Sequence, residues 1–291
     1  ERLGDVVERA TVLGRVTPHQ KRAMVRALQA RGHVVAMGGD GVNDVLALKE
    51  ADIGVAMGSG SAAARGVAQL VLLDSTFDVL PGVVAEGRRV IANIERVANL
   101  FLTKTVYATL LALAVGVARV PFPFYPRHLT VVSSLTIGIP AFFLALAPNE
   151  RRARPGFMTR VLRFAVPAGL VAAAATFGAY ALTRGHSAVD LREARTTATV
   201  VLFSVGLWIL AILARPATAA RRLLVGAMGA AFLLVLAVPA FRRFFELDPP
   251  SFAVSVWAVV VAVAAALALE GGWRVTGWHA DRSGGEYTPP G

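Results

Sequence analysis

The chain has 291 residues, of which 30 are Lys or Arg and 19 are Asp or Glu, and it combines a net charge of +11 with 55% hydrophobic residues. This apolar content excludes intrinsic disorder, and the absence of cysteine excludes a disulfide framework and a thiolate metal site. Residues 1–96 contain 12 basic and 11 acidic side chains, and residues 97–291 contain 18 and 8, so their net charges are +1 and +10. The excess of basic residues therefore lies between long uncharged runs and not on a polar folded face, which disfavours binding to nucleic acid.

Helices and short strands alternate in the first 96 residues. Thr17 and Pro18 mark a helix start, because Pro is favoured at the first helical position, and the helix is expected to continue to Ala30. Three short apolar runs predict buried strands, and a glycine-rich turn leads into a helix over about 43–50; the strands are expected at His33–Met37, Ile53–Met57 and Gln69–Leu73. This alternation predicts an α/β domain with a parallel sheet.

The motif that most strongly indicates a chemical function is the turn Gly39-Asp40-Gly41-Val42-Asn43-Asp44, which follows the first predicted strand. Ligands bind at this end of strands in parallel sheets. Two carboxylates four residues apart, Asp40 and Asp44, can present oxygens to one hard cation such as Mg²⁺, which accepts one or two carboxylates together with water and phosphate. The spacing is equally compatible with an Asp-Gly turn in which Asn43 or Asp44 caps a helix. Neither a GxGxxG fingerprint nor a Walker loop is present.

Six long apolar runs follow, each of about the 20 residues that a bilayer core requires. Five contain no Asp, Glu, Lys or Arg, and the first contains only Lys104. The alternative of buried helices in a soluble protein leaves too little polar surface for six such runs. The predicted spans are 97–117, 129–147, 164–183, 196–214, 223–241 and 251–269.

Arginines in the loops predict the orientation of these spans, because Lys and Arg accumulate on the cytoplasmic side. The loops after the second and fourth spans hold the excess: Arg151, Arg152, Arg154, Arg160 and Arg163, then Arg215, Arg221 and Arg222. Residues 1–96 and the tail from Gly271 are then cytoplasmic, and the lipid bilayer of the cell (plasma) membrane is the expected location. The start at Glu1, without a methionine or a signal peptide, suggests a cut through a longer protein.

The stretch Arg15–Leu73 resembles the end of the phosphorylation domain of P-type cation-transporting ATPases. The resemblance rests on Val16-Thr17-Pro18-His19-Gln20-Lys21, on the turn described above, and on Ala47 to Gly58. It implies the fold of the haloacid dehalogenase superfamily, ATP as substrate and Mg²⁺ as cofactor. It also implies roles for individual residues: Lys21 contacts the phosphoryl group, Asp40 and Asp44 hold Mg²⁺, and Asn43 supports the phosphate pocket. The family usually has Thr where this chain has Gly39, so one hydroxyl near the phosphate is missing.

A larger departure is that no Asp-Lys-Thr-Gly-Thr segment occurs, so the aspartate that the family phosphorylates is absent, as are the nucleotide-binding and actuator domains. We therefore expect the chain alone neither to hydrolyse ATP nor to form an aspartyl phosphate. Two alternatives to the C-terminal part of a cation pump stay open. One is a membrane-tethered phosphatase of the same superfamily, and the other is a truncated membrane protein that acts by association.

The resemblance extends into the membrane half. The passage Glu86–Ile94 resembles the segment of pumps that connects the phosphorylation domain to a long helix. Here this helix is expected to run from about Ala85 to Val117. Pumps bind the transported cation on this helix and on a proline-interrupted stretch of the next one. The corresponding path here is Lys104, Thr105, Ser133, Thr136 and Pro140.

The cation itself stays open at this stage. Ala108 and Ile137 occupy positions where calcium pumps carry carboxylates, whereas Lys104 matches a lysine of proton and potassium pumps. Lys104 either acts on the transported cation or extends to the interface. Serines and threonines in a span often bond only their own helix. A divalent cation such as Ca²⁺ is slightly favoured.

The predicted organisation has four parts. Residues 1–84 form the partial phosphorylation domain, 85–96 a helical linker, 97–270 an all-α bundle of six transmembrane helices, and 271–291 a cytoplasmic tail.

Overall fold

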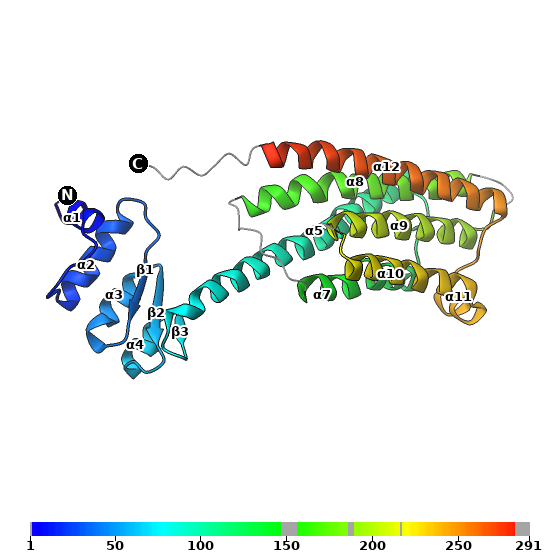
Figure 1. Ribbon diagram of the computed structural model, residues 1–291. Coiled ribbons are helices and arrows are strands. Elements are labelled where there is room, and N and C mark those ends of the chain that lie inside the picture. Colours follow the sequence, from blue (N-terminus) through cyan, green and yellow to red (C-terminus); the bar gives the residue numbers. More distant parts are fainter. Residues whose placement is uncertain (1, 147–155, 186–188, 216, 283–291) are drawn as a thin grey trace. The chain divides into compact units, whose positions relative to one another are not determined.

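The computed structural model describes residues 2–146, 156–185, 189–215 and 217–282, with the side chains of all these except Arg2 and residues 275–282. The chain divides into two compact units, residues 1–86 and 87–291, which we call the N-terminal unit and the membrane unit and describe separately. Figure 1 shows strands in the first unit and helices alone in the second.

The N-terminal unit is a small parallel sheet with helices (Figure 1). The strands lie in the order β1-β2-β3, so all three carboxyl ends meet at one edge of the sheet. Its elements are α1 (Arg2–Arg9), α2 (Pro18–Gln29), β1 (Ala36–Gly39), η1 (Val42–Asp44), α3 (Val45–Glu50), β2 (Ile53–Met57), α4 (Ala62–Val67), β3 (Leu70–Leu72) and η2 (Phe77–Val79). The predicted α/β class is therefore confirmed.

Local sequence explains where α2 begins. The Thr17 hydroxyl accepts a hydrogen bond from the Gln20 amide, and the Gln20 side chain accepts one from the Thr17 amide, which forms a capping box. Pro18 occupies the first helical position, where a missing N–H has no cost.

The prediction for the first strand is wrong at both ends. It placed the strand at His33–Met37 and assigned Gly38 and Gly39 to a turn, whereas β1 runs from Ala36 to Gly39. The reason lies in the pairing, since Ala36 is the partner of Ile53, the first residue of β2. Where a paired strand begins depends on its neighbour, and an apolar run cannot reveal where that is.

Helix α3 lies between two small groups of buried side chains in the N-terminal unit. Ala47 and Ala51 pack with Val25 of α2, and Leu48 packs with Ala56 of β2 and Ala64 of α4. These contacts fix the start of α3, and with it the preceding turn η1, against the sheet.

The described part of the membrane unit consists mainly of helices, and six segments among the described residues are long and apolar enough to cross a membrane. In Figure 1, α8, α9 and α12 run side by side. The elements are α5 (Leu80–Ala118), α6 (Pro126–Ser133), η3 (Ser134–Gly138), α7 (Ile139–Leu146), α8 (Phe157–Arg184), α9 (Leu191–Leu213), α10 (Ala219–Ala237), α11 (Pro239–Phe245) and α12 (Phe252–Arg282). The prediction of six transmembrane helices is confirmed in number, and α5 is continuous as expected.

Two span boundaries differ from the sequence prediction. The fifth span was predicted to reach residue 241, but α10 ends at Ala237 and α11 begins at Pro239, because proline has no N–H to continue the helix. Helix α12 continues through residues 271–282, which were assigned to the tail. Residues 147–155, which hold three of the arginines used to predict orientation, lie outside the described residues, and so do residues 283–291.

Candidate functional site

A buried carboxylate and a lysine from two different elements meet in the N-terminal unit. Lys21, in the first turns of α2, donates a hydrogen bond from Nζ to Oδ1 of Asp44 at 2.6 Å. Asp44 is 7% exposed, and a buried carboxylate requires such a partner to offset its lost hydration. The pair therefore joins α2 to η1, which follows the end of β1.

Two other polar members of the predicted turn, Asp40 and Asn43, are solvent-exposed. Asp40 comes directly after β1, and Asn43 lies in η1. In the part of the chain that the structure describes, the Asp40 carboxylate accepts no side-chain or backbone hydrogen bond. One acidic side chain of the motif is thus engaged by a lysine, and the other is available to a ligand.

Gly39 lies against the side chain of Asp44. A Cβ added at Gly39 would come within 2.5 Å of the Asp44 Cβ and 2.9 Å of its Oδ2. The space that a threonine side chain would need in this structure is therefore occupied by the aspartate.

The loop after β2 completes the site, and the sequence analysis missed it. The Ser61 amide donates to the carbonyl of Asp40 at 2.7 Å, and a Cβ at Gly60 would lie 2.7 Å from the same oxygen. Gly60 lets the two loops approach this closely. The Gly58-Ser59-Gly60 triplet was visible in the sequence, but only the parallel sheet brings it beside Asp40.

The donor set of this site fits Mg²⁺. The described residues contain no group of three or more His, Cys, Asp or Glu side chains that could hold a metal. Two carboxylates of one turn, with solvent access at Asp40, match a cation that keeps several waters and takes few protein ligands. Softer metals would require imidazole or thiolate ligands.

In the membrane unit, the second predicted span is interrupted where the sequence placed the cation path. Residues Ser134–Gly138 form a π-helical turn, η3, in which the Ile139 amide donates to the Ser134 carbonyl. Such turns recur at functional sites. Pro140 has no N–H, so the Thr136 carbonyl four residues earlier cannot receive the bond that an α-helix would give it.

The other predicted path residues differ in exposure. Lys104 and Ser133 are half-buried, Thr105 is exposed, and Pro140 is buried. Thr105 donates its hydroxyl hydrogen bond to the Phe101 carbonyl at 3.1 Å, which is the local bonding that the sequence left open as an alternative. Among the described residues Lys104 forms no ion pair.

Eight serine and threonine hydroxyls of the described spans bond the carbonyl four residues earlier in their own helix. This is the arrangement of Thr105, Thr130, Thr136, Thr183, Thr196, Thr197, Thr199 and Ser204. Thr103 and Thr176 are exceptions, since both are buried and their Oγ1 atoms have no hydrogen-bond partner. Neither residue is among the path residues predicted from the sequence.

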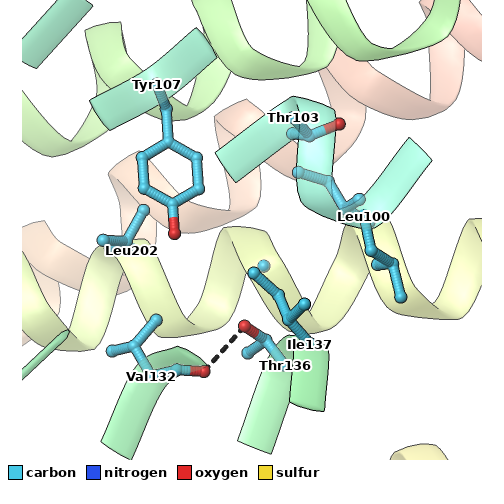
Figure 2. Close-up of a pocket in the computed structure, with 9 residues that line it drawn as sticks. Leu100, Thr103, Tyr107, Val132, Thr136, Ile137 and Leu202 are labelled. Atoms are coloured by element: carbon cyan, nitrogen blue, oxygen red, sulfur yellow. Dashed lines mark hydrogen bonds between the residues drawn. The ribbon is translucent and has the colours of Figure 1, made fainter. Parts of the chain in front are cut away.

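A small cavity of about 20 Å³ lies between α5, the second span and α9 (Figure 2). Thr136 is the predicted path residue in its wall, whereas Lys104, Thr105, Ser133 and Pro140 do not line it. The residues around it are Leu100, Thr103, Tyr107, Val132, Thr136, Ile137, Leu202, Gly206 and Ile209. Thr103 and Tyr107 are one turn apart on α5, and that four-residue spacing was the signal available in the sequence.

Comparison with known proteins finds matches to both units. Residues 121–273 match the family described as "Cation transporting ATPase, C-terminus", and residues 21–81 match "haloacid dehalogenase-like hydrolase". The chain is 51% identical over 290 residues to the calcium-transporting ATPase CtpE of Mycolicibacterium smegmatis, covering 95% of this chain and 37% of that protein. It is 34% identical over 261 residues to the probable cation-transporting ATPase exp7 of Streptococcus pneumoniae, covering 85% and 33%. The chain thus spans about a third of the length of these relatives.

Proposed function

The chain belongs to the P-type cation-transporting ATPases, and from this membership we propose that it forms the C-terminal part of an ATP-driven pump for a cation. One observation carries the proposal. An ion pair between Lys21 and the buried Asp44, in the same turn region as Asp40, occurs in the same chain as six described helices long and apolar enough to cross a membrane. A soluble phosphatase of the same superfamily would have the first feature without the second.

The N-terminal unit would handle the phosphoryl group. In this proposal Lys21 contacts it, Asp40 and Asp44 hold Mg²⁺, and Asn43 and Gly39 complete the phosphate pocket. When bound, Mg²⁺ neutralises negative charge on the phosphoryl oxygens, and positioning and charge neutralisation account for most of the catalysis of phosphoryl transfer. The 2.6 Å contact between Lys21 and Asp44 supports this assignment, because it keeps an ammonium beside a carboxylate that would bind the metal.

ATP would be the phosphoryl donor only in a complete pump. The 291 residues contain no Asp-Lys-Thr-Gly-Thr segment, so the chain alone lacks the aspartate that would accept the phosphoryl group. We propose that the isolated chain neither hydrolyses ATP nor becomes phosphorylated.

The cation path would lie along α5 and η3, with Lys104, Thr105, Ser133, Thr136 and Pro140 as its residues in this chain. The Thr136 carbonyl, which Pro140 cannot bond, supplies an oxygen ligand of the kind that hard cations accept. We propose Ca²⁺ as the cation, because CtpE relatives are named as calcium-transporting ATPases. Further ligands would come from outside this chain, since its path residues include no carboxylate.

The described structure is that of a multi-pass membrane protein. We propose the cell membrane as its location, with the N-terminal unit and the C-terminus in the cytoplasm, on the basis of the arginine-rich loops.

ATP-driven uptake of radioactive Ca²⁺ into inverted membrane vesicles that contain the complete pump tests the proposal. We expect uptake together with an acid-stable, hydroxylamine-sensitive phosphoprotein. Lys104→Ala should change cation selectivity or turnover, whereas Lys49→Ala, at an exposed lysine of α3, should not. If phosphoprotein formation depends on another cation, the proposal of Ca²⁺ is wrong, but the proposal of a cation pump stands. If the isolated 291-residue chain becomes phosphorylated, the proposal that this chain alone is inactive is wrong.

A further inference from the structure

The cavity between α5, η3 and α9 has a polar group that faces it without a partner. Tyr107 is 6% exposed, and its hydroxyl forms no hydrogen bond within the described part of the chain. Figure 2 shows this hydroxyl pointing toward the side where Val132 and Thr136 lie. A buried phenol normally has a hydrogen-bond partner, so we expect the cavity beside the Tyr107 hydroxyl to hold a ligand that bonds it.

Thr136 offers the second polar group. Its Oγ1 donates to the Val132 carbonyl at 2.7 Å, so the oxygen keeps lone pairs that can accept a bond from a ligand in the cavity. On the α9 side, a Cβ at Gly206 would lie 3.2 Å from the Thr136 Cγ2. Because residue 206 is a glycine, no side chain from this position of α9 fills the cavity.

Size and chemistry restrict the ligand to water. A space of about 20 Å³ holds about one water molecule, which needs two to four polar partners. A bound Ca²⁺ would require roughly six to eight oxygen ligands, and the lining provides three hydroxyl groups among apolar side chains and no charged group. The Thr103 hydroxyl, buried without a partner, is turned away from Tyr107 in Figure 2.

We propose that this cavity binds one water molecule, which joins the Tyr107 hydroxyl of α5 to the Thr136 hydroxyl of η3, and that it is not a cation site. Thr136 then has two roles: its carbonyl lies on the proposed cation path, and its hydroxyl binds the water molecule. The consequence for transport rests on the proposed function: the water links the helix that continues from the N-terminal unit to the turn that would bind the cation.

X-ray radiolysis of the full chain in lipid nanodiscs, read out by mass spectrometry, tests this site. Bound internal waters are activated in place, so a side chain in contact with one is oxidised and a side chain in a dry core is not. We expect oxidation of Tyr107 well above that of Tyr180, a fully buried tyrosine whose hydroxyl already donates to the Pro121 carbonyl. Adding Ca²⁺ should leave the oxidation of Tyr107 unchanged.

Gly206→Ala should reduce the oxidation of Tyr107 to the level of Tyr180, because its new methyl group lies against Thr136 at the cavity. Gly226→Ala, on α10 with open space around the added Cβ, is the matched control and should change nothing. Oxidation of Tyr107 no greater than that of Tyr180 in the parent chain would show a dry void, and protection of Tyr107 by Ca²⁺ would show a cation site; each overturns the proposal. Neither result depends on ATP-driven transport, so failure of the proposed function is distinguishable from failure of this inference.

Discussion

The two units satisfy their polar side chains in opposite ways. In the N-terminal unit, charged groups pair across long stretches of sequence, as Lys21 and Asp44 do, and water allows Asp40 to remain exposed without a partner. In the membrane unit, eight serine and threonine hydroxyls of the described spans bond a carbonyl of their own helix, because lipid offers no alternative donor or acceptor. An exposed carboxylate is therefore ordinary in the first unit, whereas in the second unit a partnerless hydroxyl that faces a cavity, as that of Tyr107 does, indicates a site.

Two charged pairs of the membrane unit join side chains of different segments. Glu95 of α5 accepts two hydrogen bonds from Arg160 of α8, and Glu270 of α12 accepts two from Arg215, which follows α9. Since these side chains are partly exposed, each pair contributes modestly to stability. Their planar, two-point geometry fixes the relative register of the helices.

The largest effect on activity is expected from a substitution at the Lys21–Asp44 pair of the N-terminal unit. Asp44→Asn removes the negative partner of Lys21 and one of the two carboxylates proposed for Mg²⁺, so phosphoprotein formation by the complete pump should fall by about 100-fold or more. The measurement is incorporation of labelled phosphate from ATP at saturating Mg²⁺. Asp78→Asn, at an exposed aspartate of η2, is the control, and equal losses in the two variants would remove the special role of Asp44.

A smaller effect is expected where the membrane unit depends on close packing. A Cβ at Gly169 of α8 would come within 2.5 Å of Val106 Cγ1 and 3.2 Å of the Thr103 carbonyl on α5. Gly169→Ala should therefore cost about 1–3 kcal/mol of unfolding free energy through overpacking. Thermal unfolding in detergent checks this value. Gly178→Ala, on the same helix with open space around the added Cβ, should be neutral or slightly stabilising, and a similar loss in both variants would argue against the packing explanation.

The smallest effect concerns a charged group that bonds the backbone in the N-terminal unit. The Val35 amide donates to Asp52 Oδ2 at 2.8 Å, and the Gln29 side chain donates to the same atom, which lowers the pKa of Asp52 below its ordinary value of 3.8. The contribution of the ionised Asp52 side chain to the free energy of unfolding is therefore fully present at pH values above its ordinary pKa. This contribution disappears as the pH falls through the lowered pKa of the folded state.

Asp52→Asn should weaken the N-terminal unit at neutral pH and flatten its stability profile on the acid side. Hydrogen exchange of the segment around Val35 within the full chain, followed from neutral pH down to about pH 3, measures this change. Asp78→Asn again provides the comparison. An unchanged acid profile in Asp52→Asn would show that the two hydrogen bonds do not stabilise the charged form.

Elements defined by local sequence were predictable. The start of α2 follows from the Thr17–Pro18 signal, β2 from five consecutive apolar or small residues, and the six spans from run length. The short helix α1 carries no comparable signal and was not predicted. The limits of β1 were wrong because they depend on the position of β2.

The same distinction applies to the candidate sites: features set by local sequence were predictable, and contacts between distant segments were not. Spacing within one turn identified Asp40 and Asp44, whereas the contact of Asp44 with Gly39 depends on how η1 folds back on the end of β1. The sequence indicated an interruption of the second span, where η3 lies, but Gly206 of α9 is 70 residues after Thr136 and meets it only in the folded bundle. Roles for these residues remain predictions.

The π-helical turn η3 has a consequence for how this span can change in evolution. An α-helix rotates by about 100° per residue, and a π turn accommodates one residue more than an α turn. Deleting a single residue from Ser134–Gly138 would let the turn close as an α-helix without rotating the flanking segments, because the π turn takes up its extra residue within one turn. The loss of one codon at this place would therefore remove the π turn in one step, while the side chains of α6 and α7 keep their relative directions.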